Sequence, residues 1–504
     1  MRSPEVKKVL RILVPHVASD ARALRLFTNA IDEPSQTKFV TCISPVIEDN
    51  WSGAPHELSR VKWFRNFADY CASQICIIPK SLATAHSARK AKYNSARNVK
   101  KRFGQSLGFT QRARQSNSAH FANIPETTVT TYPKSKAYPP LKHWMYETDA
   151  IKKKWKKHLT SGRRPDSRRP YLPMMKVNTS LIDHDVRPNE SRRFRDSNGT
   201  LVCGVYRDFC PNEDVLPVVD DIVQENVSNR KNVRMEDPGS LVQVGFSAGA
   251  RSAPKFDWVR NVTNRKLPSD VINDMDDRSS SAFALFWNLC RNSLPDEVMN
   301  DFDEFFDECC MPRMDPCKGA AEGSAGNGDQ RAFGDYSIQI GDDKFIFRNA
   351  ERAPPAGVCG QNYSRSLFDL PSSSFNLSSF GRSTHFEHQP HKFAISWTVR
   401  RDHPSDAGGH FYISTYRIRV QAAANTLVVW RPKDIHGTSL QDLRPADPNP
   451  AFLQTGIAIV TSNRLPSVWK KYRAGVLSHQ DAMRILAESD DELDEHFEHL
   501  QAEQ

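Results

Sequence analysis

Short apolar runs follow one another closely between residues 385 and 462, and they form the strongest pattern in the chain. The runs are Phe393–Val399, His410–Ser414, Arg417–Val420, Leu427–Trp430 and Gly456–Val460. Their length and close spacing, with a Gly408-Gly409 turn between two of them, are typical of the strands of a sandwich or barrel. A further hairpin is predicted over Tyr336–Arg348, around Gly341-Asp342-Asp343. We therefore expect the C-terminal half to contain the main β-domain.

Apolar residues three and four positions apart predict helices before and after this region. The clearest predicted helices are Ser280–Asn292 and Leu294–Cys310, and a short one is predicted over Ser467–Arg473. Leu201–Tyr206 and Leu241–Phe246 are predicted strands. Near the N-terminus the pattern favours helices over Val6–Val14 and Val61–Ile78, and β-branched and aromatic residues favour a strand over Lys38–Val46.

Charge divides the chain more sharply than hydropathy does. The net charge is +10, yet the stretch from His86 to Gln115 holds nine Lys or Arg and no acid, whereas the last thirty residues are acidic. A second basic block, Lys152–Lys157, continues to Arg169 and resembles a bipartite nuclear-import signal. With aromatic residues interleaved, the basic region 86–170 is typical of a segment that binds DNA or RNA. The alternative is a solvated, partly disordered linker.

These shifts in composition divide the chain into four predicted regions. They are a small N-terminal region (1–85), a basic and partly disordered segment (86–200), the β-domain with supporting helices (201–475) and an acidic C-terminal helix or tail (476–504). A mean hydropathy of −0.59 and the lack of a long apolar run exclude a membrane-spanning protein, so we expect an intracellular one. The ten cysteines form no Cys-x-x-Cys pair, which excludes zinc-finger spacing.

Residues that could bind a metal ion lie at both ends of the set of predicted strands. His385 and Glu387 precede them, and residues i and i+2 of a strand project from the same face. His436 follows 51 residues after His385, near the end of the strand set. Two imidazoles and one carboxylate are the facial ligand set of non-haem Fe(II) sites, which leaves the opposite positions open.

The His-x-carboxylate pattern alone has little specificity. It occurs again at His479-Gln480-Asp481 and at His496-Phe497-Glu498, in helical, acidic surroundings with no strands after them. A competing triad could combine Asp402 or Asp406 with His403 or His410, but these residues lie in a predicted turn. The strands and His436 therefore carry the metal-site prediction.

The ordered motifs resemble those of a known enzyme family. They are His385-x-Glu387, Gly408-Gly409-His410-Phe411-Tyr412, Leu427-Val428-Val429-Trp430-Arg431-Pro432 and His436-Gly437-Thr438. Together they are similar to the 2-oxoglutarate/Fe(II)-dependent dioxygenases, and most similar to TET/JBP-type oxygenases of fungi. The resemblance covers residues 336–466 and implies an α+β fold built on a double-stranded β-helix, or jelly-roll.

The resemblance also implies a function and a set of site residues. His385, Glu387 and His436 would bind Fe(II), 2-oxoglutarate would be the co-substrate, and the substrate would be a methylated base in nucleic acid. The family usually places an Arg at the start of the last strand to hold the 2-oxoglutarate carboxylate, but Leu453–Val460 contains none. Arg444 and Arg464 are the substitutes on either side of that strand.

Two other functions fit the same residues. One is a non-catalytic nuclear protein that binds nucleic acid or a protein partner and uses a degenerate dioxygenase scaffold. The absence of Arg from the last strand favours it. The other is a metal-dependent hydrolase or isomerase on a cupin-like barrel, which would not need a cation for a co-substrate in its pocket.

Overall fold

The computed structural model describes residues 4–51, 59–107, 121–161, 171–231, 239–249, 254–259, 267–312, 314, 335–348, 354, 356–361, 382–444 and 453–477. Contacts divide the chain into two compact units, Met1–Gly104 and Gln105–Gln504. The predicted acidic C-terminal helix or tail lies outside the described residues from residue 478 onward.

The first unit is helical. It contains α1 (Pro4–Ser19), α2 (Ala21–Thr28), α3 (Glu33–Asn50), α4 (Arg60–Ser73) and most of α5 (Lys80–Ser106). Aromatic rings from α2, α3 and α4 meet in its core, where the rings of Phe27 and Phe67 have centroids 5.2 Å apart. The predicted helices at Val6–Val14 and Val61–Ile78 correspond to α1 and α4.

The predicted strand over Lys38–Val46 is wrong, because these residues lie within α3. A capping box starts this helix: Asp32 accepts a hydrogen bond from the backbone of Ser35, whose hydroxyl in turn accepts one from the backbone of Asp32. Its buried residues, Phe39, Val40, Ile43 and Ile47, recur at helical spacing. The cap and this spacing outweigh the local β-propensity.

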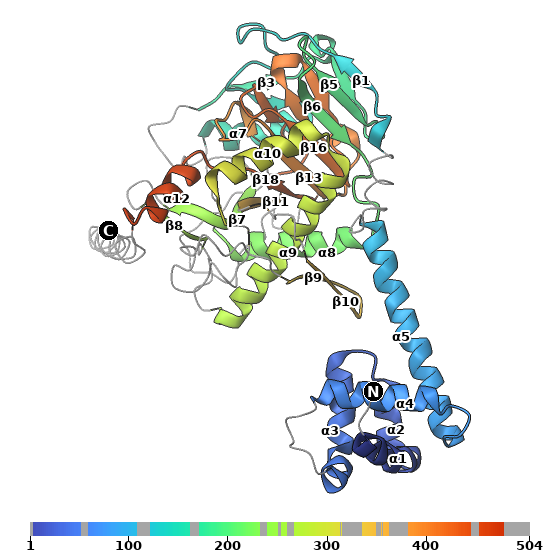
Figure 1. Ribbon diagram of the computed structural model, residues 1–504. Helices are drawn as coiled ribbons and strands as arrows, with labels where there is room; N and C mark the ends of the chain where they lie inside the picture. Colours follow the sequence, from blue (N-terminus) through green and yellow to red (C-terminus); the bar gives the residue numbers. More distant parts are fainter. Residues whose placement is uncertain are drawn as a thin grey trace, which may run out of the picture. The chain divides into compact units, whose positions relative to one another are not determined.

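Two sheets form the centre of the second unit (Figure 1). The larger sheet has nine strands, in the order β1 (Glu126–Thr128), β5 (Arg192–Arg195), β6 (Leu201–Tyr206), β16 (Thr426–Trp430), β13 (Ala394–Arg401), β18 (Gln454–Ile459), β11 (Ala356–Gln361), β7 (Ser240–Gly249) and β8 (Pro254–Trp258). The smaller sheet has five, in the order β12 (Arg382–His385), β17 (His436–Thr438), β14 (Phe411–Ile413), β15 (Ile418–Val420) and β4 (His184–Val186).

One apolar core joins the two sheets. It includes Phe194, Val205 and Ala394 from the larger sheet and Ile413 and Ile418 from the smaller one. Two further pairs of strands flank them, β9 (Asp335–Ile340) with β10 (Asp343–Arg348) and β2 (Trp144–Tyr146) with β3 (Met174–Lys176). The predicted α+β class is confirmed, and the predicted hairpin is the β9–β10 pair.

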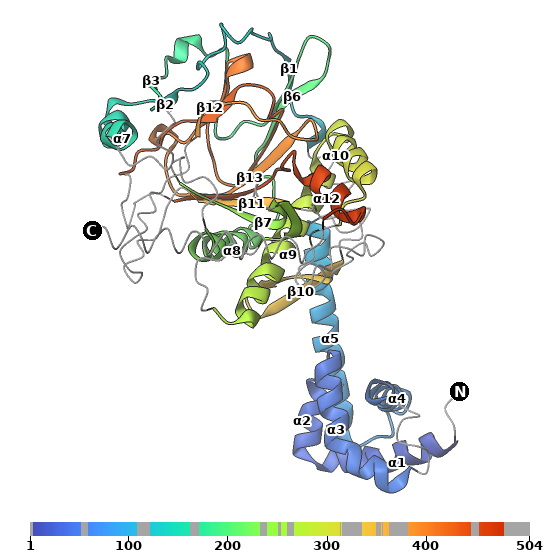
Figure 2. The same cartoon turned by 90° about the vertical axis from the view of Figure 1, so that its left-hand side faces the viewer.

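Helices cover one face of the larger sheet (Figure 2). They include α8 (Val215–Asn229), which contacts β11, β13 and β18, and α9 (Ser269–Ser293), which packs on α8. The unit also contains α7 (Asp149–Ser161), α10 (Asp296–Cys309) and α12 (Leu465–Arg473). The predicted helices at 280–292 and 294–310 correspond to α9 and α10. None of the helices in the described part of the chain has the length and apolar composition needed to cross a membrane.

Several strands lie in segments where the sequence pattern predicts none. β11 lies between the predicted hairpin at Tyr336–Arg348 and His385, and β1, β4 and β5 lie within the basic segment 86–200. The basic residues of β5 are paired there: Arg195 contacts Glu126 at 2.8 Å and Glu297 at 2.7 Å. Composition placed boundaries at residues 85 and 200, whereas the division of contacts falls between Gly104 and Gln105.

A buried carboxylate fastens α8 to the larger sheet. Asp220 accepts hydrogen bonds from Thr455 of β18 (2.5 Å) and from Arg400 of β13 (3.0 Å). It also accepts one from Gln224, one turn further along α8 (2.8 Å). Asp220 is 5% exposed, and its loss would leave the buried hydroxyl of Thr455 without this acceptor, whereas Arg400 would keep Asp402 as its partner.

We expect Asp220→Ala to lower the free energy of unfolding of the second unit by about 1–3 kcal/mol, because it removes the acceptor of the buried Thr455 hydroxyl. The matched control is Asp221→Ala on the exposed side of the same helix, which we expect to stay within about 0.5 kcal/mol of the parent chain. Urea unfolding measures both. Equal midpoints for the two variants would show that the contact does not stabilise the fold.

Candidate metal centre

The candidate site begins with the pairing of β12 and β17. These strands are antiparallel, and their register sets His385 directly opposite His436. The two imidazole centroids are 4.3 Å apart. Gly437 makes the close approach of the strands possible, because a Cβ there would lie 2.9 Å from the carbonyl oxygen of Arg382. His436 therefore lies beside the His-x-Glu pair, as the strand pattern predicts.

Glu387 lies just beyond the end of β12. Its backbone N–H donates to the carbonyl of Pro432 at 2.8 Å, which ties the segment to the chain that precedes His436. Oε1 of Glu387 lies 3.9 Å from Nε2 of His385. One potential ligand atom from each of His385, Glu387 and His436 lies within 4.8 Å of the others, so the three predicted ligands converge.

Backbone carbonyls fix the orientation of both imidazoles. Nδ1 of His385 lies 2.7 Å from the carbonyl oxygen of Ser383, and Nδ1 of His436 lies 2.8 Å from that of Asp434. A carbonyl only accepts hydrogen bonds, so each Nδ1 carries the proton and each Nε2 presents its lone pair. Nε2 of His385 is buried and has no hydrogen-bond partner among the described residues. This is the arrangement that metal-binding histidines adopt.

The protonation states also fit a divalent cation. Burial lowers the pKa of His436 to about 4. Burial likewise lowers the pKa of His385, and the neighbouring His436 and Arg382 lower it further. Burial alone would raise the pKa of Glu387, but the charge and hydrogen bond of Arg382 outweigh it and bring that pKa below its usual value. Two neutral imidazoles and a carboxylate are thus available at neutral pH, as metal binding requires.

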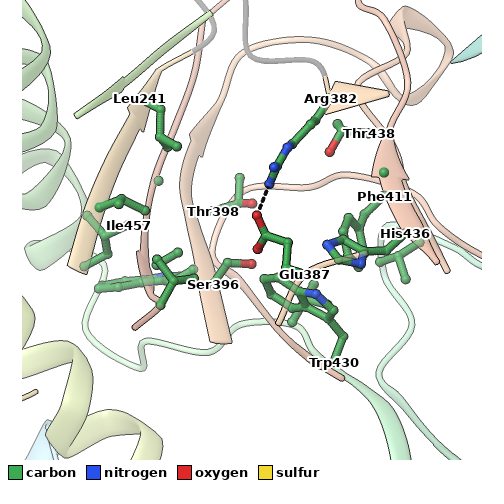
Figure 3. A pocket seen from close by; sticks show the side chains of 18 of the residues that line it. Leu241, Arg382, Glu387, Ser396, Thr398, Phe411, Trp430, His436, Thr438 and Ile457 are labelled. Atoms are coloured by element: carbon green, nitrogen blue, oxygen red, sulfur yellow. Dashed lines mark hydrogen bonds and ion pairs between the residues drawn. The ribbon is translucent and has the colours of Figure 1, made fainter. Parts of the chain in front are cut away.

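The three side chains lie at the wall of a cavity of about 730 Å³ between the two sheets. Figure 3 shows Glu387 and His436 in this cavity, with Arg382 reaching toward Glu387 from above. The apolar part of the lining includes Leu241, Phe411, Trp430 and Ile457, and its hydroxyl groups include those of Ser396, Thr398 and Thr438. The cavity thus combines apolar and aromatic side chains with many polar groups that could bind and orient a small molecule.

Arg382 is a site residue that sequence reasoning missed. Its guanidinium lies 2.5 Å from Oε1 of Glu387. Residues three apart on a regular strand project from opposite faces, so alternation predicts Arg382 on the side away from His385. The register of β12 shifts between these two residues, however, and both line the cavity. A β-bulge of this kind has no signature in the sequence.

The other arginine in the cavity wall is Arg207, which is held by the protein itself. It donates to Thr426 Oγ1 at 2.9 Å and to the carbonyls of Arg187 and Gln421 at 2.8 Å. The predicted co-substrate residues lie elsewhere: Arg464 donates to the carbonyl of Gly249 at 3.1 Å, and Arg444 is exposed. Neither of them lines the cavity.

The competing triad does not assemble among the described residues. Nδ1 of His410 accepts the backbone N–H of Ala422 at 3.0 Å, and Asp402 is paired with Arg400 at 2.8 Å. Within the described ranges, the group of three that could hold a metal ion is His385, Glu387 and His436. The repeats of the motif at residues 479–481 and 496–498 lie outside those ranges.

A second buried carboxylate, also missed from the sequence, supports the smaller sheet. Glu147 accepts a hydrogen bond from Tyr412 at 2.5 Å and lies 3.3 Å from Nε2 of His410. Arg419, which is paired with Asp185, lies 3.6 Å from it. Burial alone would raise the pKa of Glu147, but hydrogen bonds from His410 and Tyr412 and the charge of Arg419 keep it below its usual value. This network holds β14, the strand that pairs with β17, in place.

Comparison with known proteins adds little to this description. No protein-family model matches the chain, and no curated protein matches it. Among solved structures, NgTET1 in complex with 5mC DNA is similar at 7% sequence identity and a TM-score of 0.33, over 63% of this chain and 89% of that chain. So distant a likeness defines neither fold nor function.

We expect His385→Ala to weaken Co(II) binding at least about 100-fold, because it removes one of three ligands. His388→Ala is the matched control: this histidine is three residues away, exposed and outside the cluster, and its loss should leave binding unchanged. Titration followed by the visible absorption of Co(II) measures both. Equal loss in the two variants, or unchanged binding in both, would contradict the assignment.

Proposed function

We propose that this chain is an Fe(II)/2-oxoglutarate-dependent dioxygenase that oxidises a methylated base in nucleic acid, with His385, Glu387 and His436 as the iron ligands. The observation that carries the proposal is the convergence of two neutral imidazoles and one carboxylate at the wall of the cavity. We further propose that the two sheets are those of a double-stranded β-helix, or jelly-roll, whose core and cavity lie between them.

The ligand set favours an iron centre with open coordination positions over a structural metal site in which protein ligands fill every position. Two His and one carboxylate on one side of a metal leave its other positions open for a co-substrate and an oxidant. When bound there, Fe(II) with 2-oxoglutarate and O₂ supplies the oxidising chemistry, while the protein positions the reactants and keeps water out. The chain's own part is to hold Nε2 of both histidines unprotonated and Glu387 ionised.

Arg382 is the residue that we propose for the 2-oxoglutarate carboxylate. A guanidinium pairs with a carboxylate through two parallel hydrogen bonds, and this one already contacts a carboxylate, that of Glu387, inside the cavity. Arg444 and Arg464 remain predictions for this role that no contact supports. A cation in the cavity also favours an anionic co-substrate over the hydrolase or isomerase alternative, which would not use one.

The rest of the cavity suits a planar ring. Trp430 and Phe411 present aromatic faces beside His436, with ring centroids 5.8 Å and 5.9 Å from its imidazole. Hydroxyl groups such as those of Ser396 and Thr398 can bond the edge of a base. A base in a duplex must leave the stack to reach such a pocket. The volume is within the range of about 300–1,000 Å³ in which proteins bind small molecules.

The runner-up is a non-catalytic nuclear protein that binds nucleic acid or a protein partner on a degenerate dioxygenase scaffold. The favouring observation is that β18 (Gln454–Ile459) contains no Arg, while Arg382 in the cavity wall is paired with the carboxylate of Glu387. Nuclear localisation belongs to both proposals and rests on the basic residues from Lys152 to Arg169. Lys153 and Lys156 of this segment are exposed on α7.

Anaerobic addition of 2-oxoglutarate to the Fe(II)-loaded chain tests the proposal. We expect a visible charge-transfer band and, after O₂ is admitted, formation of succinate together with oxidation of the methyl group in DNA that contains 5-methylcytosine. Iron binding without the band and without succinate would favour the non-catalytic alternative. Binding of neither iron nor 2-oxoglutarate would overturn the proposal.

We expect Arg382→Gln to weaken 2-oxoglutarate binding at least about tenfold while Co(II) still binds, because the carboxylate partner is lost and the metal ligands remain. Arg464→Gln, which replaces a cation outside the cavity, is the control and should leave 2-oxoglutarate affinity unchanged. Calorimetric titration of both Co(II)-loaded variants measures this. A larger loss in Arg464→Gln would restore that residue as the co-substrate partner.

A further inference from the structure

The net positive charge of the chain comes from one of its two units. Residues 1–104 contain 18 Lys or Arg and 8 Asp or Glu, a net charge of +10 that equals the net charge of the whole chain. Residues 105–504 therefore carry equal numbers of basic and acidic residues. The net charge that attracts a distant polyanion therefore lies in the helical unit.

Within that unit, α5 concentrates the charge. It is 27 residues long and contains eight Lys or Arg and no acid. Its buried residues, Leu82, Ala85, His86 and Phe103, lie toward its two ends. From residue 90 to residue 102 no side chain is buried, and in both views this part of α5 extends past α1–α4 (Figures 1 and 2). We call residues 90–102 the basic stretch of α5.

The basic residues of this stretch share a face. Lys90, Arg97 and Lys101 are seven and four residues apart, and Tyr93 and Lys100 lie between them at helical spacing. All five side chains are exposed, Tyr93 by 44%. At about 1.5 Å per residue the row extends about 17 Å along the helix, which is long enough to meet several phosphates of one strand.

Among the described residues, Lys90, Arg97 and Lys101 form no ion pair with an acid. Like charges four residues apart, such as those of Arg97 and Lys101, repel each other along a helix. The second basic block differs in this respect. Lys154 of α7 is paired with Asp442 at 2.7 Å, and the neighbouring Trp155 is buried and donates to the carbonyl of Gln441.

We propose that the basic stretch of α5 binds the phosphate backbone of duplex DNA without regard to sequence. A helix with its side chains is about 10–12 Å wide and fits the major groove of B-form DNA, which is about 12 Å wide, whereas the major groove of A-form RNA is too narrow. A membrane surface requires an apolar face, and Ala91, Tyr93, Ala96 and Val99 are the only apolar residues of the stretch. The surface extends the proposed function, whose nucleic-acid substrate it would hold, but it does not require the metal.

The test compares two triple variants of the full chain with equal changes in net charge. Lys90→Glu, Arg97→Glu and Lys101→Glu together remove the row. Lys38→Glu, Lys62→Glu and Arg65→Glu replace exposed cations of α3 and α4. Fluorescence anisotropy measures binding to a short, unmethylated DNA duplex of mixed sequence, without metal, over a series of NaCl concentrations. Circular dichroism checks folding, and a Gln version of the first triple variant replaces it if the Glu version does not fold.

We expect the row variant to bind at least about 100-fold more weakly at about 0.1 M salt, and the slope of log K against log salt to become shallower by about 3, since three phosphate contacts are lost. The control should lose less than about fivefold. Equal losses of affinity in the two variants would show that the basic stretch of α5 is not the DNA-binding surface. Tighter binding of the parent chain to duplex RNA, single-stranded DNA or anionic vesicles would show that duplex DNA is not its preferred partner.

Co(II) binding, measured in the same proteins, separates this inference from the proposed function. Normal DNA binding with no metal binding would leave the inference standing and overturn the enzyme. Normal metal binding together with unchanged DNA affinity in the row variant would overturn the inference and leave the proposed enzyme standing.

Discussion

The candidate site depends on the register of one short strand pair. Because His385 is opposite His436 across β12 and β17, two imidazoles enter the cavity side by side, each held by a carbonyl two residues earlier in the chain. A slip of one residue in either strand would turn its ring to the other face, away from the ring of its partner. The contacts around the pair prevent this: Pro432 holds Glu387 on one side, and the Glu147 network holds β14 against β17 on the other.

Charge compensation within the cavity follows from that geometry. An ionised Glu387 in a largely buried place needs a cation, and Arg382 provides one at 2.5 Å. A divalent metal held by the same carboxylate would satisfy the same need, so the guanidinium and the metal act on one charge. This coupling gives Arg382 a role whether or not 2-oxoglutarate is bound. It also explains why the cavity contains this arginine although β18 has none.

The sequence could predict the parts of the structure that follow from strong periodicity. The strands from Phe393 to Val460 and the helices α9 and α10 have such patterns, and the three candidate ligands could be predicted together because His436 follows strands that return it to His385. The strand predicted at Lys38–Val46 failed because a cap at Asp32 and buried helical spacing override β-propensity. Arg382 could not be found, since its place depends on an irregularity in register. The strands β1, β4 and β5 are polar, and Arg195 of β5 becomes compatible with a sheet through partners distant in sequence, Glu126 and Glu297.

The separation of charge between the two units has a physical consequence for a site of this kind. A cavity that must hold two neutral imidazoles beside a cation is sensitive to positive potential, which favours their deprotonated forms but weakens attraction for a metal ion. Residues 105–504 carry no net charge, and Arg382 and Glu387 are the oppositely charged groups beside the two imidazoles in the cavity lining. Attraction to a polyanion at long range, by contrast, needs many uncompensated cations that remain hydrated. Because these cations lie on a helix of the other unit, the chain can attract a polyanion without adding positive charge to the lining of the candidate metal site.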